Sequence, residues 1–298
     1  MAMRLHDDEL VSTPDLVHRL VAAQLPRWSG LPVRPGPAGG TDHHLFRLGD
    51  DLLVRMPKIA WAQEQALADA RWLPHLAAHL PVEVPAPVAV GEPGEGFPFR
   101  WSVVPWLEGE PASPEGLDAL GARDLGELVA ALRMVPTAGG PVKEGTSRGV
   151  PLANLDDDVR AAIRASGTRI DGPAVTRVWD AALAARPAAA PSWLHGDLLP
   201  GNLLTRAGRL TGVIDWGAMG VGDPAADLIP AWGLPLADGE RADFRATATA
   251  GLADPDDAWQ RGRGWMLVQA VIALPYYWDR WPAFARAGQA RIATVLAD

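Results

Sequence analysis

The sequence predicts an α+β protein with two lobes, a small N-terminal lobe built on an antiparallel sheet and a larger, mainly helical C-terminal lobe. Residues 39–57 and 84–110 combine alternating apolar residues with turn signals, which favours short paired strands. From residue 113 onward, apolar residues recur at helical spacing instead. With 298 residues the chain is long enough for two domains, and we place the lobes at 1–105 and 106–298.

The N-terminal lobe is expected to hold most of the strands. Residues 39–57 predict two strands joined by a tight turn at 49–51. Residues 60–80 follow with a helical pattern. Pro74 lies inside that pattern and should kink or divide the helix, because proline cannot donate a backbone hydrogen bond. Residues 84–110 predict two short strands around a Pro/Gly turn, followed by a segment that connects the lobes.

The C-terminal lobe is expected to be helical around one hairpin. Its first helix should begin at Ser113, whose side chain can cap it, with Pro114 in the first turn. The Ala/Pro stretch at 186–192 is typical of a linker, and a hairpin with its turn at 206–209 follows. Further helices are expected at 154–167, 174–185, 257–274 and 283–297.

Composition narrows the range of partners. The formal net charge of -9 disfavours nucleic acid and favours cationic small molecules near the surface. The absence of cysteine excludes disulfides, thiolate metal sites and cysteine nucleophiles. The start "MAMRLHDDEL" lacks a hydrophobic signal segment, and no apolar run is long enough to span a bilayer. We therefore expect a cytoplasmic protein with no nucleic-acid or membrane partner.

Two polar motifs lie between apolar segments of the C-terminal half. The first, "WLHGDLLPGNLL" at 193–204, contains His195 and Asp197, and four residues separate Asp197 from Asn202. The second, "VIDWGAMGVGDPAADL" at 213–228, contains Asp215 directly before Trp and Gly. Protein kinases have the same spacing in their His-Arg-Asp and Asp-Phe-Gly motifs. A loop that leads into a tight hairpin would place the two carboxylates and the amide around one pocket.

These two motifs resemble those of the aminoglycoside phosphotransferase and choline-kinase group of small-molecule kinases, in which Gly commonly follows the His. The resemblance implies a two-lobed protein-kinase-like fold and ATP- or GTP-dependent phosphorylation of a small-molecule hydroxyl. It implies that Asp197 is the catalytic base and that Asn202 and Asp215 bind Mg²⁺. A purely structural role for the loop residues is the alternative, but it gives no reason for all of the spacings.

Three further residues of these motifs are expected to support the site. His195 is expected to hold the loop by hydrogen bonds rather than to transfer protons. Asp223 precedes Pro224 and an apolar segment, so it is typical of a helix cap. Asp227 lies one turn later, and the resemblance implies that it braces the catalytic loop from behind.

On the nucleotide side, the resemblance places the phosphate-binding loop at "GGTDHHLF", where Gly39, Gly40 and Thr41 would cover the phosphates. The lysine of related kinases corresponds to Arg55 in "LLVRMP", a departure that keeps the positive charge but changes its geometry. Lys58, just beyond Pro57, is the alternative cation.

The resemblance also implies a carboxylate partner for this cation on the following helix. Asp69 aligns best, with Glu64 as its competitor, although Asp is shorter than the Glu that is usual in the family. Residues 102–107 would present backbone groups to adenine. Val104 and Trp106 are our candidates there, and simple packing is the alternative role.

The acceptor side carries no motif. Asp279, Tyr276 and Tyr277 are candidates, because a carboxylate and aromatic rings can bind an amine or stack on a sugar. Surface charge and core packing are the alternatives. The resemblance and the acidic balance favour an aminoglycoside-like antibiotic as acceptor, with macrolide, choline-like or sugar acceptors also open.

Two other functional classes compete with the kinase. Arg55 and Asp69 depart from the usual pair, as in a nucleotide-binding pseudokinase module, whereas the retained Asp197, Asn202 and Asp215 argue against that class. The run "GDLLPGN" suggests a metallophosphoesterase, but the further His and Asp blocks that a two-metal site needs are missing at suitable spacing. The sequence therefore favours the small-molecule kinase.

Overall fold

The computed structural model describes residues 9–37, 42–113 and 117–298. It divides into an N-terminal unit, formed by Met1–Ala78 and Glu83–Glu108, and a C-terminal unit, formed by His79–Val82 and Gly109–Asp298. The functional division into a nucleotide-binding lobe at 1–105 and a catalytic and acceptor-binding lobe at 106–298 stays a prediction. Each unit is described by itself.

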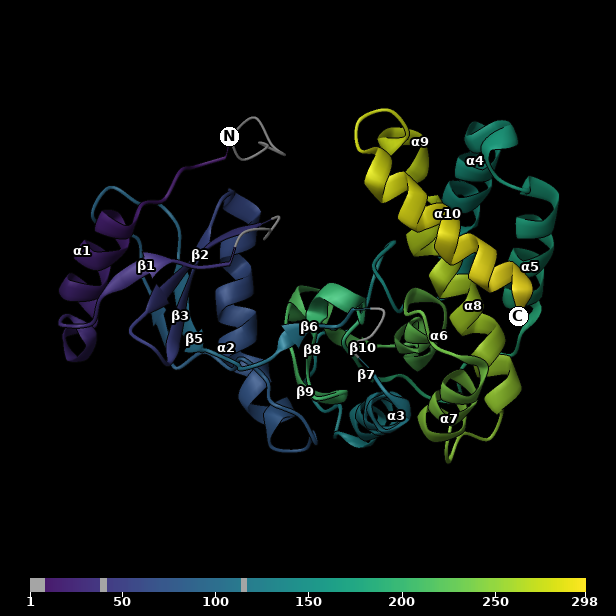
Figure 1. Ribbon diagram of the computed structural model, residues 1–298, viewed down its shortest axis with the longest axis horizontal. Helices are drawn as coiled ribbons and strands as arrows, with labels where there is room; N and C mark the ends of the chain where they lie inside the picture. Colours follow the sequence, from purple (N-terminus) through teal and green to yellow (C-terminus); the bar gives the residue numbers. More distant parts are fainter. Residues whose placement is uncertain (1–8, 38–41, 114–116) are drawn as a thin grey trace. The chain divides into compact units, whose positions relative to one another are not determined.

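The N-terminal unit is built on a five-stranded antiparallel sheet with the strand order β1-β2-β3-β5-β4 (Figure 1). The predicted hairpin is present, with Leu48 paired to Leu52 across the turn. The strands are β1 (Val33–Pro35), β2 (His43–Leu48), β3 (Leu52–Pro57), β4 (Ala89–Gly91) and β5 (Trp101–Pro105).

Two helices belong to this sheet unit, α1 (Pro14–Gln24) and α2 (Gln63–Ala77), with short 3-10 turns η1 (Pro26–Trp28) and η2 (Ala60–Ala62). The sequence analysis missed α1, although Thr13 caps it by accepting a hydrogen bond from the amide of Leu16 at 3.3 Å. Its apolar face packs into the core of the unit with buried strand residues. This core comprises Val17, Leu20, Val21, Phe46, Leu48, Val54, Met56, Phe97, Trp101 and Val103.

Helix α2 was expected to break or kink at Pro74, yet it continues as one helix to Ala77. Pro74 lies in the last turn, and its nitrogen cannot donate a helical hydrogen bond. Only a few helical residues follow it, so the helix loses little by this missing bond. The buried side chains Leu73 and Leu76 on either side of it hold this turn against the rest of the unit.

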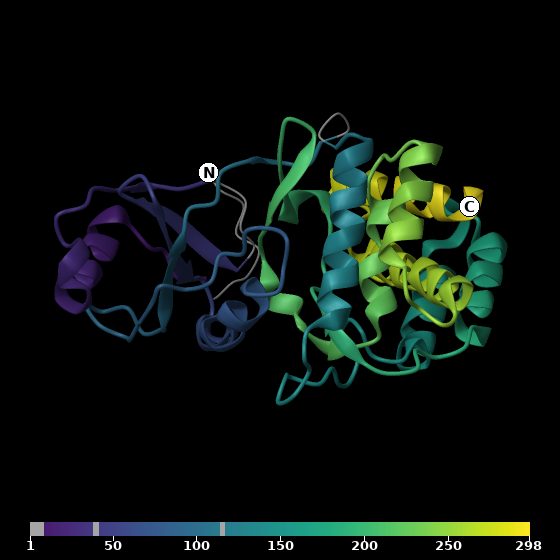
Figure 2. The same cartoon turned by 90° about the horizontal axis from the view of Figure 1, so that it is seen from below.

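The C-terminal unit is mainly helical. Helices α3 and α7 lie side by side (Figures 1 and 2), and a Cβ on Gly126 of α3 would meet Thr247 Cβ at 2.7 Å, so glycine permits this approach. None of the described helices combines the length and apolarity that a membrane span requires. The helices are α3 (Ala119–Met134), α4 (Asp156–Ser166), α5 (Gly172–Ala184), α6 (Pro230–Gly233), α7 (Asp238–Ala248), α8 (Pro255–Val271), α9 (Leu274–Tyr277) and α10 (Pro282–Ala297).

Helix α3 starts later than predicted. It begins at Ala119, where the carboxylate of Asp118 accepts a hydrogen bond from the amide of Gly121 at 2.9 Å. Asp118 is therefore the N-cap that we had assigned to Ser113, and a short Asp side chain suits this position equally well. Pro114, which was expected in the first turn, lies outside the described residues.

Helix α8 is the central helix of this unit, with buried residues on all of its faces, including Trp265, Met266 and Leu267. It packs against α5 and α10 and against the 3-10 turn η7 (Pro224–Leu228). The other 3-10 turns are η3 (Leu152–Leu155), η4 (Gly167–Arg169), η5 (Pro200–Asn202) and η6 (Trp216–Ala218).

Two small sheets carry the motifs. The first has the order β6-β8-β9, in which β8 (Leu203–Arg206) and β9 (Arg209–Val213) form the predicted hairpin and β6 (Glu110–Pro111) lies beside β8. In the second, β7 (Ser192–Leu194) pairs antiparallel with β10 (Gly220–Gly222). The two polar motifs therefore leave β7 and β9 as loops that are fixed at both ends.

Candidate active site

The first polar motif forms a tightly turned loop between β7 and β8. The amide of Leu199 donates to the carbonyl of Asp197 at 2.7 Å, and the amide of Asn202 donates to the carbonyl of Leu199 at 2.9 Å. Asn202 Nδ2 also donates to the carbonyl oxygen of Asp197 at 2.9 Å and to its Oδ2 at 3.2 Å. These bonds leave the amide oxygen of Asn202 available for another partner.

The register of the hairpin brings the residue before Asp215 into contact with this loop. Leu203 pairs with Val213, and the amide of Ile214 donates to the carbonyl of Asn202 at 2.9 Å. Asp215 itself has φ 61° and ψ 67°, a left-handed conformation that is strained for a residue with a side chain. No hydrogen bond or ion pair of its exposed carboxylate occurs within the described ranges.

Asn202 and Asp215 therefore have free oxygen atoms that are suitable ligands for a divalent cation. One offers an amide oxygen and the other a carboxylate, and Mg²⁺ prefers such hard oxygen ligands together with water and phosphate oxygens. Their role as ligands stays a prediction.

Asp227 holds the loop from its buried side. Its two carboxylate oxygens accept hydrogen bonds from the amides of His195 and Gly196, each at 2.7 Å. Burial raises the pKa of Asp227 to about 6, while the two amide donors act in the opposite direction. Gly196 has φ 82°, and a Cβ there would meet the carbonyl oxygen of Ala218 at 2.8 Å, so glycine is required at this position.

His195 is fully buried, and both of its ring nitrogens are engaged. Nδ1 accepts a hydrogen bond from the amide of Asp197 at 3.1 Å, and Nε2 lies 3.0 Å from the carbonyl oxygen of Ile214. Burial lowers its pKa, which favours the neutral ring with the proton on Nε2. Its ring also meets Trp216 edge-on at 4.6 Å. This geometry suits a residue that links the two motifs.

Asp223 does more than cap η7. Its Oδ1 accepts from the amide of Ala225 at 3.0 Å, as expected of a cap. The same carboxylate pairs with Arg261 of α8, whose Nε lies 2.8 Å from Oδ2. Both side chains of this pair are mostly buried, so Asp223 also ties the second motif to the central helix.

Two cations of the site were missed by the sequence analysis. Arg148 Nη1 lies 2.6 Å from Asp197 Oδ1 in an ion pair and also donates to the carbonyl of Gly196 at 3.3 Å. Lys143 Nζ donates to the carbonyl of Ala218 at 2.8 Å, and burial lowers the pKa of Lys143. Their segment has no marked pattern; the only signal is that Lys143 is one of two lysines in the chain.

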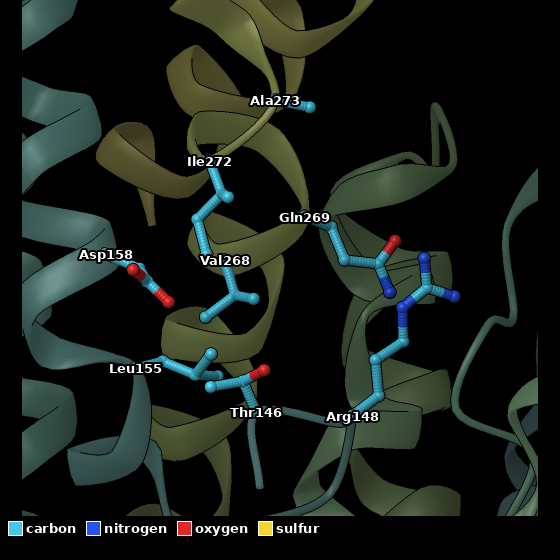
Figure 3. A pocket seen from close by; sticks show the side chains of 8 residues that line it. All are labelled: Thr146, Arg148, Leu155, Asp158, Val268, Gln269, Ile272 and Ala273. Carbon is cyan, nitrogen blue, oxygen red and sulfur yellow. The ribbon is translucent and has the colours of Figure 1, made fainter.

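A cavity of about 290 Å³ in the C-terminal unit shares Arg148 with this site (Figure 3). It ends at Ala273 and is not lined by the predicted acceptor residues Tyr276, Tyr277 or Asp279. The Asp279 side chain is 92% exposed and lies 3.9 Å from Arg169. The lining residues are Thr146, Arg148, Leu155, Asp158, Val268, Gln269, Ile272 and Ala273.

The structure pairs the predicted cation and carboxylate of the N-terminal unit. Arg55 Nη1 on β3 lies 2.7 Å from Asp69 Oδ2 on α2, with the side chains 11% and 1% exposed. The longer arginine side chain compensates for the shorter aspartate. The competitor Glu64 lies in the first turn of α2. The phosphate-binding role of Arg55, and the alternative of Lys58, remain untested.

The structure describes only some of the remaining candidates for nucleotide binding. Gly39, Gly40 and Thr41 lie outside the described residues. Val104 is buried in β5, opposite Leu53 of β3. Trp106 donates its amide to the carbonyl of Asp51 at 2.8 Å, and its ring lies 3.9 Å below the guanidinium of Arg47.

A double-mutant cycle on the buried pair should reveal its coupling. Asp69→Glu and Arg55→Lys are each expected to destabilise the protein, because each changes the length of one partner in a packed pair. The double variant should recover at least about 1 kcal/mol of the summed loss, because a shorter cation and a longer acid again match. Urea unfolding measures the four proteins. Effects that add within about 0.5 kcal/mol would contradict the coupling.

The comparisons with known proteins agree with this fold. The strand-rich unit, the helical unit and the two motif loops define a kinase-like phosphotransferase. The model of the phosphotransferase enzyme family (APH) matches residues 34–265, and the chain belongs to this family. It is a phosphotransferase of the class that acts on hydroxyl groups, and the predicted α+β, two-lobed protein-kinase-like fold is confirmed.

Relatives and solved structures include enzymes named for two kinds of antibiotic. An aminoglycoside 3′-phosphotransferase from Escherichia coli is 28% identical over 224 residues, covering 70% of this chain and 77% of the relative. The GDP and kanamycin complex of an aminoglycoside 2″-phosphotransferase has a TM-score of 0.68 at 19% identity, covering 94% and 98% of the two chains. The macrolide 2′-phosphotransferase MphH from Brachybacterium faecium has a TM-score of 0.63 at 24% identity, covering 93% and 97%.

Proposed function

We propose that this enzyme transfers the γ-phosphoryl group of ATP or GTP to a hydroxyl of an amine-bearing small molecule, with Asp197 as base and Mg²⁺ as cofactor. The observation that carries the proposal is the hydrogen-bonded convergence of the Asp197 loop with Asn202 and the start of the Asp215 loop. An aminoglycoside-like antibiotic is the acceptor that the sequence analysis favoured, with macrolide, choline-like and sugar acceptors as alternatives.

In the proposed reaction, the acceptor oxygen forms a bond to the γ-phosphorus while the bond from that phosphorus to the bridging oxygen breaks. The hydroxyl proton passes to the carboxylate of Asp197, and the nucleoside diphosphate leaves. Asp197 is partly exposed and is held by Asn202 and Arg148, so its orientation is fixed before the acceptor binds. Positioning of this kind supplies most of the catalysis in phosphoryl transfer.

Asn202 Oδ1 and the carboxylate of Asp215 would hold the magnesium ion, and the ion when bound neutralises charge on the phosphates. The strained backbone of Asp215 directs its carboxylate away from local partners and leaves it free for that role. His195 fixes the distance between the two loops, because its ring is hydrogen-bonded to Asp197 on one and to Ile214 on the other.

The test is an acceptor screen with purified protein, ATP or GTP, and Mg²⁺. Nucleoside diphosphate release above the acceptor-free rate, with a phosphorylated acceptor found by mass spectrometry, is the expected result. Kanamycin, erythromycin and choline represent the three amine-bearing classes. Magnesium-dependent nucleotide binding without transfer to any acceptor would favour the pseudokinase instead.

A further inference from the structure

The cavity beside Asp197 has two polar ends separated by an apolar wall. Figure 3 shows Arg148 and Gln269 on one side and Asp158 on the other, with Leu155, Val268 and Ile272 between them. The Arg148 guanidinium is the same group that lies 2.6 Å from Asp197 Oδ1. Arg148 therefore links this cavity to the proposed base, although Asp197 is not itself one of the lining residues.

The cavity lining is electrically balanced. It contains one cation, Arg148, and one carboxylate, Asp158. Arg148 is already paired with Asp197, and Arg291 of α10 also interacts electrostatically with that carboxylate. Within the described ranges, no ion pair or hydrogen bond engages the carboxylate of Asp158. The formal net charge of -9 is thus not concentrated at this cavity, which offers a single unpaired anionic group.

The cavity is open to solvent and has a volume of about 290 Å³. This volume is at the small end of the range for ligand pockets. It suits one saccharide-sized ring, and the open mouth leaves room for the rest of a larger acceptor outside the cavity.

We propose that this cavity takes one ring that carries a single protonated amine and a hydroxyl, on an acceptor that is otherwise largely apolar. This rests on the proposed function. The amine pairs with Asp158, the apolar face of the ring packs on Val268 and Ile272, and the hydroxyl lies at the Arg148 end of the cavity, on the side of Asp197. A polycationic acceptor is disfavoured, because each additional ammonium would lie against an apolar wall or near Arg148 without a carboxylate to pair with it.

Isothermal titration calorimetry on the full-length protein without nucleotide tests this selectivity. Erythromycin, which has one amine on an apolar body, is expected to bind at least about tenfold more tightly than kanamycin, which has several amines. Asp158→Asn should weaken erythromycin binding about two- to fivefold, the effect of losing one exposed ion pair.

Asp157→Asn is the matched control. Asp157 lies in the same first turn of α4 and is exposed, but it does not line the cavity. It should leave erythromycin binding unchanged, which separates a local ion pair from a change in helix-terminal charge. Kanamycin binding as tight as erythromycin binding, no erythromycin binding, or equal effects of the two variants would each overturn the proposal.

Failure of this proposal is distinguishable from failure of the proposed function. The binding pattern above without phosphoryl transfer from ATP or GTP supports the cavity assignment and contradicts the proposed function. Transfer to kanamycin with tight kanamycin binding supports the proposed function and overturns the cavity assignment.

Discussion

Replacing Asp197 with asparagine is expected to lower kcat about 10²- to 10⁴-fold, the range that a general base contributes. An amide at this position can still accept the hydrogen bond from Asn202, so the loop keeps its shape. It cannot take a hydroxyl proton, and it also loses the ion pair with Arg148. Steady-state kinetics with the acceptor from the screen should show the loss in kcat with the KM for nucleotide little changed.

The control for this variant is Asp238→Asn. Asp238 is exposed in the first turn of α7, and the substitution removes the same charge outside the two motifs. Both variants should unfold at temperatures close to that of the wild type. A kcat for Asp197→Asn within twofold of the wild-type value would contradict the role of this carboxylate as base.

The sequence predicted those parts of the site that short-range spacing determines. The hairpin at 203–213 brings Asn202 beside Ile214, so the distance along the chain between the motifs already implies their proximity. Local patterns had limits even so. Helix α1 was missed despite its Thr13 cap, and the start of α3 was placed too early because Ser113 was taken as its cap.

Long-range contacts could not be predicted in this way. Arg148 reaches the Asp197 loop from a segment far back in the chain that has no periodicity and no motif. Val268 of α8 and Ile272, the C-cap of this helix, line the cavity, and their spacing of four residues is typical of a core face. The predicted acceptor candidates Asp279, Tyr276 and Tyr277 were chosen by residue type, and type alone does not place a side chain in a cavity.

Removing the carboxylate of Asp227 is expected to have the largest effect on stability. Asp227→Ala leaves the buried amides of His195 and Gly196 without the two hydrogen bonds that they now donate at 2.7 Å. Each unsatisfied buried donor costs roughly 1–3 kcal/mol, and relief of the buried charge offsets part of this, so we expect a net loss of about 2–4 kcal/mol at pH 7. Urea unfolding measures the loss, and Asp238→Ala should change the free energy of unfolding by less than about 1 kcal/mol.

The pH dependence of this loss in stability shows whether burial or the two hydrogen bonds dominate the pKa of Asp227. Because burial raises the pKa of Asp227 to about 6, above the ordinary value of 3.8, the protonation-linked part of its contribution to the free energy of unfolding is fully present below pH 3.8 and is lost as the pH rises through 6. The difference between the wild type and Asp227→Ala should therefore shrink from pH 4 to pH 7, by up to about 3 kcal/mol at 1.36 kcal/mol per pKa unit. A difference that widens over the same interval would mean that the two amide donors outweigh burial and lower the pKa. In that case the catalytic loop would be held most firmly when Asp227 is charged.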